Sequence, residues 1–240
     1  VLICTGFYIL TASASETDGP PGAYFLGHAL ESIGYPVTYV SDLYSTPLFR
    51  DLVPLENLVE FPLANEENSK RFAQSLLART QASVVISIER CGMTTAGRYL
   101  NMHGLDISQY NAKLDYLFDH AVTLGIGDGG NEIGMGNLMG HIRSVETLPD
   151  DPTSTRVNRL IIASVSNWGS YGLIAALSLL SKRRLLPSTQ QEEEVICRMV
   201  DSGAVDGIST QRVYAVDGFS LGENRRTLER LNALLSEQGL

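Results

Sequence analysis

Short apolar runs alternate with amphipathic stretches along most of the chain, and this alternation constrains the fold more than any other feature. The apolar runs predict β-strands at Val1–Leu10, Pro36–Val40, Ser83–Ile88, Ala121–Ile126 and Arg159–Val165. The amphipathic or longer apolar stretches predict helices at Gly22–Ile33, Ser69–Arg79, Leu114–His120, Asn137–Ile142, Tyr171–Leu180, Gln190–Ser202 and Arg225–Glu237. Strands that alternate with helices form a mainly parallel sheet covered on both faces. We therefore expect an α/β fold, a Rossmann-like three-layer sandwich, in a single domain of residues 1–240.

Composition excludes several classes of protein. The formal net charge of −9 argues against binding to nucleic-acid phosphates, and no apolar run is long enough to span a membrane. Three scattered cysteines, Cys4, Cys91 and Cys197, without CxxC spacing, fit a reducing compartment such as the cytoplasm or the mitochondrial matrix. The chain begins inside a strand-like run without an initiator methionine, so we expect a further domain or a targeting peptide upstream.

Four predicted strands are followed by loops rich in polar residues. Ligands of parallel sheets bind beyond the carboxyl ends of the strands, and these ends all face the same side. The sequence therefore predicts that the four loops converge on one site: Glu16–Gly22, Glu89–Gly92, Gly127–Glu132 and Ser166–Gly169.

The loop after the Ala121–Ile126 run is the most informative of the four. Its glycines match GxGxxG, which favours a dinucleotide site, but Asp128 and Glu132 would repel a pyrophosphate unless a metal ion lay between them. The backbone N–H groups of Gly129 and Gly130 could instead hold a carboxylate, and the two acidic side chains could accept an ammonium group or exchange protons. An amino acid carries both charges. The alternative is a tight turn in which Asp128 caps a helix.

The other loops have both a structural and a functional interpretation. Asp18 could cap the helix at Gly22–Ile33. Arg90 could form a structural ion pair or hold a substrate carboxylate with its fork of donors. Trp168 could lie in the core or form a pocket wall. The histidines show no metal-ligand spacing, so no catalytic histidine is expected.

Four segments, in this order, resemble the C-terminal domain of the D-glutamate cyclase family: ETDGPPGA (Glu16–Ala23), IERCG (Ile88–Gly92), GIGDGGNEIGMG (Gly125–Gly136) and SNWGSYGL (Ser166–Leu173). Tyr99-Leu100-Asn101 and the tail Ser202–Gly222 are also similar to that family. The resemblance implies interconversion of D-glutamate and 5-oxo-D-proline with loss or gain of water. It also implies, from the animal members, a preceding domain and a mitochondrial location.

Chemistry applied to these motifs assigns the following roles. Cyclisation needs a base for the α-ammonium group and an acid for the departing oxygen, and two carboxylates in different environments can divide these roles. We expect Asp128 to be the base and Glu132 or Glu16 the acid. Oxyanion stabilisation is expected from the N–H groups of Gly129 and Gly130. The remaining substrate-binding candidates are Asp18, Glu89, Arg90, Asn101, Asn131, Asn167 and Trp168, with Arg90 and Asn167 on the α-carboxylate and Trp168 against the ring.

Several alternatives remain open at this point. Hard oxygen ligands at Glu16, Asp18, Asp128 and Glu132 would suit Mg²⁺, Ca²⁺ or Mn²⁺, and a homo-oligomer is compatible with the sequence. The competing functions are a non-catalytic binding module for an acidic amino acid or a nucleotide, a metal-dependent hydrolase of a related small acid, and a dinucleotide enzyme.

Overall fold

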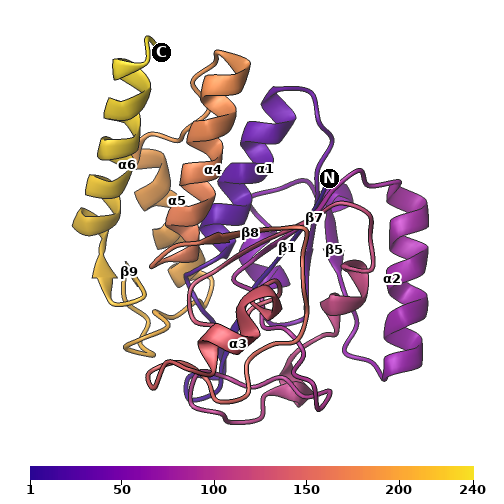
Figure 1. Ribbon diagram of the computed structural model, residues 1–240. Helices are drawn as coiled ribbons and strands as arrows, with labels where there is room; N and C mark the ends of the chain where they lie inside the picture. The colour runs from indigo at the N-terminus through magenta and orange to yellow at the C-terminus, as the bar shows by residue number, and fades with distance from the viewer.

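A six-stranded parallel sheet forms the centre of the protein (Figure 1), which a computed structural model describes over residues 1–240. The strand order is β5-β4-β1-β6-β7-β8, and every neighbouring pair is parallel. The strands are β1 (Leu2–Thr5), β4 (Thr38–Ser41), β5 (Leu58–Glu60), β6 (Val85–Ile88), β7 (Thr123–Gly127) and β8 (Arg159–Ile162). The chain runs outward from β1 to β5 and then returns to the other side of β1. The strand order therefore reverses between β1 and β6, and the carboxyl ends of such a pair are where open α/β sheets bind ligands.

Helices cover both faces of the sheet, which confirms the three-layer α/β architecture. Figure 1 shows α1 (Pro20–Ser32), α4 (Ser166–Ser181), α5 (Thr189–Asp201) and α6 (Leu221–Glu237) on one side and α2 (Glu66–Thr80) on the other. Successive side chains of a strand point to opposite faces. Accordingly, Ile3 packs in the core under α1 and α4, whereas Leu2 and Cys4 pack in the core under α2.

Short elements complete the fold. The short helices are the 3₁₀ turns η1 (Thr46–Phe49), η2 (Leu55–Asn57), η3 (Ser108–Tyr110), η4 (Leu114–Leu117) and η5 (Gly136–Leu138), and the one-turn helix α3 (Met139–Ile142). Two antiparallel hairpins pair β2 (Tyr8–Ile9) with β3 (Ala14–Ser15), and β9 (Ala215–Val216) with β10 (Phe219–Ser220). None of the helices combines the length and the apolar character that crossing a bilayer would require.

The main differences from the expected elements lie at their ends. The apolar run Val1–Leu10 is not one strand, because the chain turns at Gly6 (φ 106°) and continues into the β2–β3 hairpin. A φ in this range favours glycine. The stretch Leu114–His120 forms only the 3₁₀ turn η4, and the three-residue edge strand β5 was not expected.

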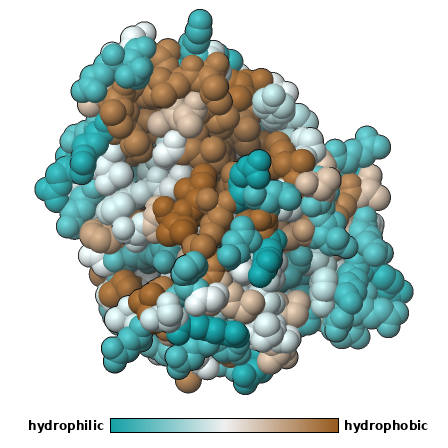
Figure 2. All heavy atoms as spheres, viewed as in Figure 1, coloured by the Kyte–Doolittle hydropathy of each residue, from teal (hydrophilic) through white to brown (hydrophobic).

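Apolar side chains gather on the upper part of the face in Figure 2, over the region where Figure 1 shows α4 and β8. Exposed apolar residues of these two elements include Ile162, Leu179 and Leu180. Strand β8 is the edge of the sheet and has no partner on its outer side.

Glu192 is a buried carboxyl group of α5, remote from the loops at the strand ends. Its Oε1 lies 3.4 Å from the hydroxyl of Tyr171, and its Oε2 has no partner. Burial raises the pKa of Glu192 to about 7. Since this value exceeds that of an unfolded glutamic acid, about 4.3, the stability contributed by Glu192 is full below pH 4 and is lost as the pH rises through 7.

Glu192→Gln is therefore expected to stabilise the protein selectively at higher pH. The gain in unfolding free energy should be about 1 kcal/mol at pH 5 and should reach about 3–4 kcal/mol at pH 8. Urea unfolding of both proteins at the two pH values measures this difference. Glu194→Gln, at an exposed position of the same helix, is the matched control and should show no such trend. An equal effect of Glu192→Gln at both pH values would contradict the prediction.

Candidate active site

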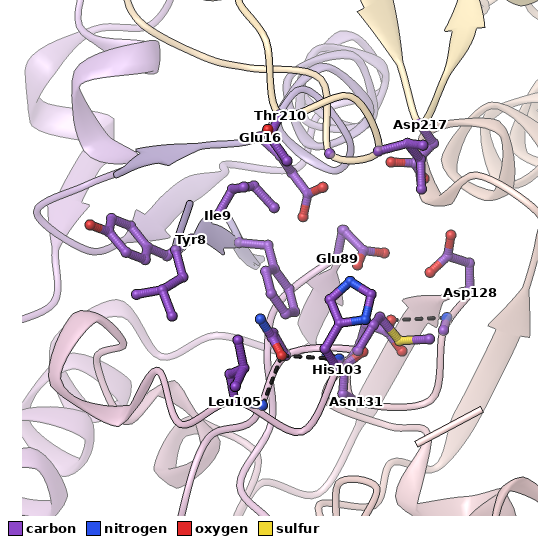
Figure 3. A pocket seen from close by; sticks show the side chains of 18 of the residues that line it. Tyr8, Ile9, Glu16, Glu89, His103, Leu105, Asp128, Asn131, Thr210 and Asp217 are labelled. Atoms are coloured by element: carbon purple, nitrogen blue, oxygen red, sulfur yellow. Dashed lines mark hydrogen bonds between the residues drawn. The ribbon is translucent and has the colours of Figure 1, made fainter. Parts of the chain in front are cut away.

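A cavity of about 690 Å³ lies beyond the carboxyl ends of β6 and β7, in the region where the polar loops were expected to converge (Figure 3). Its walls come from the β2 segment, from the loops after β6, β7 and β8, and from a C-terminal segment that contains Gly207 and Asp217. Asn101 and His103 add a further wall. The structure thus brings together segments from both ends of the chain.

Carboxylates dominate the polar wall of this cavity. Glu16, Glu89, Asp128, Glu132 and Asp217 line it, and no lysine or arginine does. In Figure 3, Glu16, Glu89, Asp128 and Asp217 surround the same space. Burial raises the pKa of each of these four carboxyl groups, and repulsion from neighbouring carboxylates raises it further. The cavity therefore favours protons or a positively charged ligand.

Glu132 occupies the two N–H groups that the sequence assigned to oxyanion binding. The N–H of Gly129 donates to its Oε1 at 2.9 Å, and the N–H of Gly130 donates to its Oε2 at 2.8 Å. The glycine loop is thus an anion-binding turn that is already filled by its own carboxylate. A substrate oxyanion would have to displace Glu132, so the expected oxyanion hole is not free.

Asp18 and Asn167 cap each other's helices. Asp18 Oδ2 accepts the N–H of Ser166 at 2.7 Å, and its Oδ1 accepts the N–H of Asn167 at 2.8 Å, which caps α4. In return, Asn167 Oδ1 accepts the N–H groups of Gly19 and Gly22 at the start of α1. A cap on α1 was one of the two roles considered for Asp18, but it caps α4 because the two helix N-termini lie side by side. Asn167 is held by this exchange and does not line the cavity.

Arg90 and Trp168 also have structural partners outside the cavity lining. The guanidinium of Arg90 is buried, lies 2.6 Å from Asp42 and donates to the carbonyls of Gly6 and Ala112. The structural ion pair is thus the interpretation that the geometry supports for Arg90. The indole N–H of Trp168 donates to Asn224 Oδ1 at 2.7 Å, which places it between α4 and α6.

The asparagine candidates and His103 do lie at the cavity. Asn101 Oδ1 accepts the N–H groups of His103 and Leu105, which shapes the loop on one side. Asn131 donates to the carbonyl of Leu100, while its Oδ1 is buried without a partner. His103 lines the cavity although no histidine was expected there.

Asp217 is the acidic residue that sequence reasoning missed. It follows β9 in a turn, and its φ of 50° is the left-handed conformation that non-glycine residues rarely adopt. Asp206 holds this turn, because its Oδ1 accepts the N–H of Gly218 at 2.7 Å. A β-carbon on Gly207 would lie 2.1 Å from Glu16 Oε2 and 2.9 Å from Asp217 Oδ1. The sequence does contain a feature that could have pointed to Asp217, namely the Val-Asp-Gly tripeptide that occurs at both 205–207 and 216–218.

Glu89 shares the left-handed backbone conformation, with a φ of 44°. Its Oε2 accepts a hydrogen bond from the hydroxyl of Ser166 at 2.6 Å, so the start of α4 orients this carboxyl group. Strained backbone at two acidic residues of one cavity is typical of functional sites.

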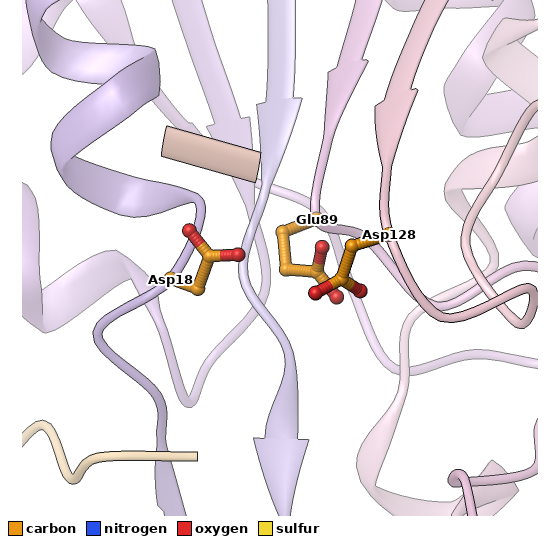
Figure 4. A group of neighbouring side chains, drawn as sticks. All are labelled: Asp18, Glu89 and Asp128. Atoms are coloured by element: carbon orange, nitrogen blue, oxygen red, sulfur yellow. The ribbon is translucent and has the colours of Figure 1, made fainter. Parts of the chain in front are cut away.

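Three of the carboxylates are close enough to share one ion. Oxygen atoms of Asp18, Glu89 and Asp128 lie within 4.8 Å of one another (Figure 4). Carboxylate oxygens are the ligands that Mg²⁺, Ca²⁺ and Mn²⁺ prefer. Glu89 and Asp128 line the cavity, whereas Asp18 does not. Glu16 and Glu132, the other two ligands considered from the sequence, line the cavity but are not members of this group.

Comparison with known proteins places this chain in a family. The family model described as "D-glutamate cyclase-like, C-terminal" matches residues 1–232. The chain belongs to this family. Human mitochondrial D-glutamate cyclase is 32% identical over 268 residues, which cover 91% of this chain and 43% of that protein. This family member therefore spans less than half the length of the curated relative that it matches.

Proposed function

We propose that this protein is a hydro-lyase that interconverts D-glutamate and 5-oxo-D-proline plus water. The observation that carries the proposal is the group of buried and half-buried carboxyl groups around a cavity that no lysine or arginine lines. Such a site can accept the α-ammonium group of an amino acid and exchange protons with it. The family and the human relative named D-glutamate cyclase support the choice of substrate.

The reaction joins the α-nitrogen to the γ-carboxyl carbon and releases one γ-oxygen as water. The ionised form of Asp128 takes a proton from the α-ammonium group, which frees the nitrogen lone pair for attack. Burial and repulsion from Glu132 raise the pKa of Asp128 to about 10, so the population of this form grows as the pH rises. A protonated neighbour, Glu16 or Asp217, gives one proton to the departing oxygen. Both keep their protons to higher pH than free carboxylic acids, because burial raises their pKa. The nitrogen loses a second proton as the ring forms, and the oxygen gains a second one as it leaves, so that two protons leave the nitrogen and two leave with the water. Glu132, tied to Gly129 and Gly130, is then a positioning residue that fixes the loop carrying Asp128.

A divalent cation fits the group formed by Asp18, Glu89 and Asp128, and we propose Mg²⁺ or Mn²⁺ as the cofactor. The donor set is made of hard oxygens from three separate loops. When bound there, the ion would supply positive charge for the carboxylates of the substrate, which the cavity wall itself lacks. Asp128 has two oxygens, so a ligand role at one leaves the other for proton transfer.

Addition of Mg²⁺ or Mn²⁺ is expected to raise the thermal unfolding temperature by several degrees. An ion at about 100 times its dissociation constant stabilises the folded state by about 2.7 kcal/mol, which corresponds to about 2–4 °C per kcal/mol in a chain of this size. Differential scanning fluorimetry measures the shift. Glu89→Gln should reduce it, and Glu56→Gln, at an exposed site on η2, should not. Equal shifts in both variants, or none in the parent protein, would contradict this site.

The reaction itself is tested by incubating the protein with D-glutamate, L-glutamate and both enantiomers of 5-oxoproline, with and without Mn²⁺. Chiral chromatography should show conversion of the D-series only. If no compound is converted under either condition, the hydro-lyase proposal is wrong. Calorimetric binding of D-glutamate without turnover would instead favour a non-catalytic binding module.

We also propose that the protein works in a reducing compartment, the mitochondrial matrix or the cytoplasm. The human relative is named as mitochondrial, and the three cysteines are free in the structure.

A further inference from the structure

The cavity is larger than free glutamate requires. Pockets of about 300–1,000 Å³ take ligands of drug size, and this one has a volume of about 690 Å³. Glutamate is a much smaller molecule. Part of the cavity is therefore available to a group attached to the reacting amino acid.

The unused part of the cavity is apolar. Among the residues that line the cavity, Phe7, Ile9, Leu10 and Leu105 are apolar. In Figure 3, Ile9 and Leu105 lie on the opposite side of the cavity from Asp128 and Asp217. Leu105 is 49% exposed, so it presents apolar surface that no part of the chain covers. An apolar substituent would bury this surface.

Charge favours a substrate whose γ-carboxyl group is substituted. Free glutamate brings two carboxylates into a wall of five acidic side chains that includes no lysine or arginine. Conversion of the γ-carboxylate into an amide removes one negative charge and leaves the α-ammonium group, which the acidic wall attracts. A γ-amide also carries its substituent on the reacting carbon, next to the place where the apolar wall begins.

We propose that this site cyclises γ-amides of D-glutamate that carry an apolar substituent, and that it releases an amine in place of water. The inference rests on the cyclisation proposed above and names a wider substrate class for the same site. The α-nitrogen bonds to the γ-carbonyl carbon, and the bond from that carbon to the amide nitrogen breaks. The α-nitrogen loses two protons, the first of them to Asp128, and the departing nitrogen gains two, so that the amine leaves as an ammonium ion. No electrons are exchanged with any other reactant.

Two matched γ-amides test the apolar wall. The γ-benzylamide and the γ-methylamide of D-glutamate have the same reacting groups and differ mainly in apolar size. Formation of 5-oxo-D-proline is followed by chiral chromatography, with the enzyme-free rate subtracted and D-glutamate run in parallel. We expect kcat/KM to be at least about tenfold higher for the benzylamide than for the methylamide, and higher for both amides than for D-glutamate.

Leu105→Ala should remove most of the preference for benzylamide over methylamide. Leu180→Ala, at a position on α4 that is 83% exposed and outside the cavity lining, is the control with the same substitution and should keep the preference. Turnover of D-glutamate without faster turnover of the amides would overturn this inference and leave the hydro-lyase proposal intact. No turnover of any compound would overturn both.

Discussion

Asp128→Asn is expected to lower kcat for 5-oxo-D-proline formation by about 10²–10⁴-fold, the contribution typical of a general base. Asparagine has nearly the same shape, but its amide cannot take a proton from the α-ammonium group. Asp128 lines the cavity and has an oxygen within 4.8 Å of oxygens of Asp18 and Glu89. The measurement is kcat and KM with D-glutamate at saturating Mn²⁺, with Asp119→Asn, an exposed aspartate outside the cavity lining, as the matched control.

A stability measurement distinguishes a loss of catalysis in Asp128→Asn from a loss of folded protein. Burial raises the pKa of Asp128, with repulsion from Glu132 as the next cause. The ionised form is therefore disfavoured in the folded protein, and stability falls as the pH rises toward the folded-state pKa. Asp128→Asn removes that charge, so the variant should be at least as stable as the parent protein at pH 8 in the absence of metal. A stable variant with near-normal kcat would assign the base to another residue, with Glu16 and Asp217 the next candidates.

Arg90→Met is expected to destabilise the protein by about 3–5 kcal/mol, because it leaves a buried charge without its partner. Arg90 and Asp42 are 1% and 2% exposed in their side chains. The substitution also removes the donors to the carbonyls of Gly6 and Ala112. Urea unfolding measures the loss, and Arg90→Met combined with Asp42→Leu should recover part of it, because the double variant buries no unpaired charge.

Arg225, which pairs with Glu193 at the surface, provides a control in which the same substitution to methionine is made in an exposed ion pair. Arg225 is half exposed, and such pairs contribute at most about 1 kcal/mol, so Arg225→Met should have little effect. Suppose that Arg90→Met lowered the unfolding free energy as little as Arg225→Met but raised KM for D-glutamate. That result would contradict a purely structural role and support the hypothesis that Arg90 binds the α-carboxylate.

Periodicity and loop composition were sufficient to anticipate most of the architecture. Strands β1, β4, β6, β7 and β8 each fall within or next to a run of apolar residues. Burial on both faces explains why the runs of β1, β4, β6 and β7 are nearly continuous, whereas the edge strand β8 is partly exposed. The parallel arrangement then placed the polar loops after β6 and β7 on one side, where Glu89 and Asp128 do meet. The edge strand β5 was not predicted, because three residues are too few to show a periodic pattern of apolar side chains.

The roles of individual polar residues were harder to anticipate, since most polar groups have several plausible partners. A cap on the helix next to it in sequence was one interpretation of Asp18, but Asp18 caps α4 instead. Gly129 and Gly130 were expected to serve a substrate, but they serve Glu132, a neighbour whose side chain folds back. In both cases the residue was identified correctly as part of a polar cluster, and its partner depended on geometry.

Local sequence was enough to establish the alternating elements, the acidic glycine loop and the family, because each is carried by residues close together in the chain. The tertiary structure alone decided which carboxylates face the cavity and which side chains are already paired. Asp18 and Asn167, 149 positions apart, cap each other's helices. Arg90 pairs with Asp42 and does not line the cavity. Asp217, from the C-terminal hairpin, lines it. These contacts join distant segments, and their strength depends on burial and on competing partners, which no local pattern records.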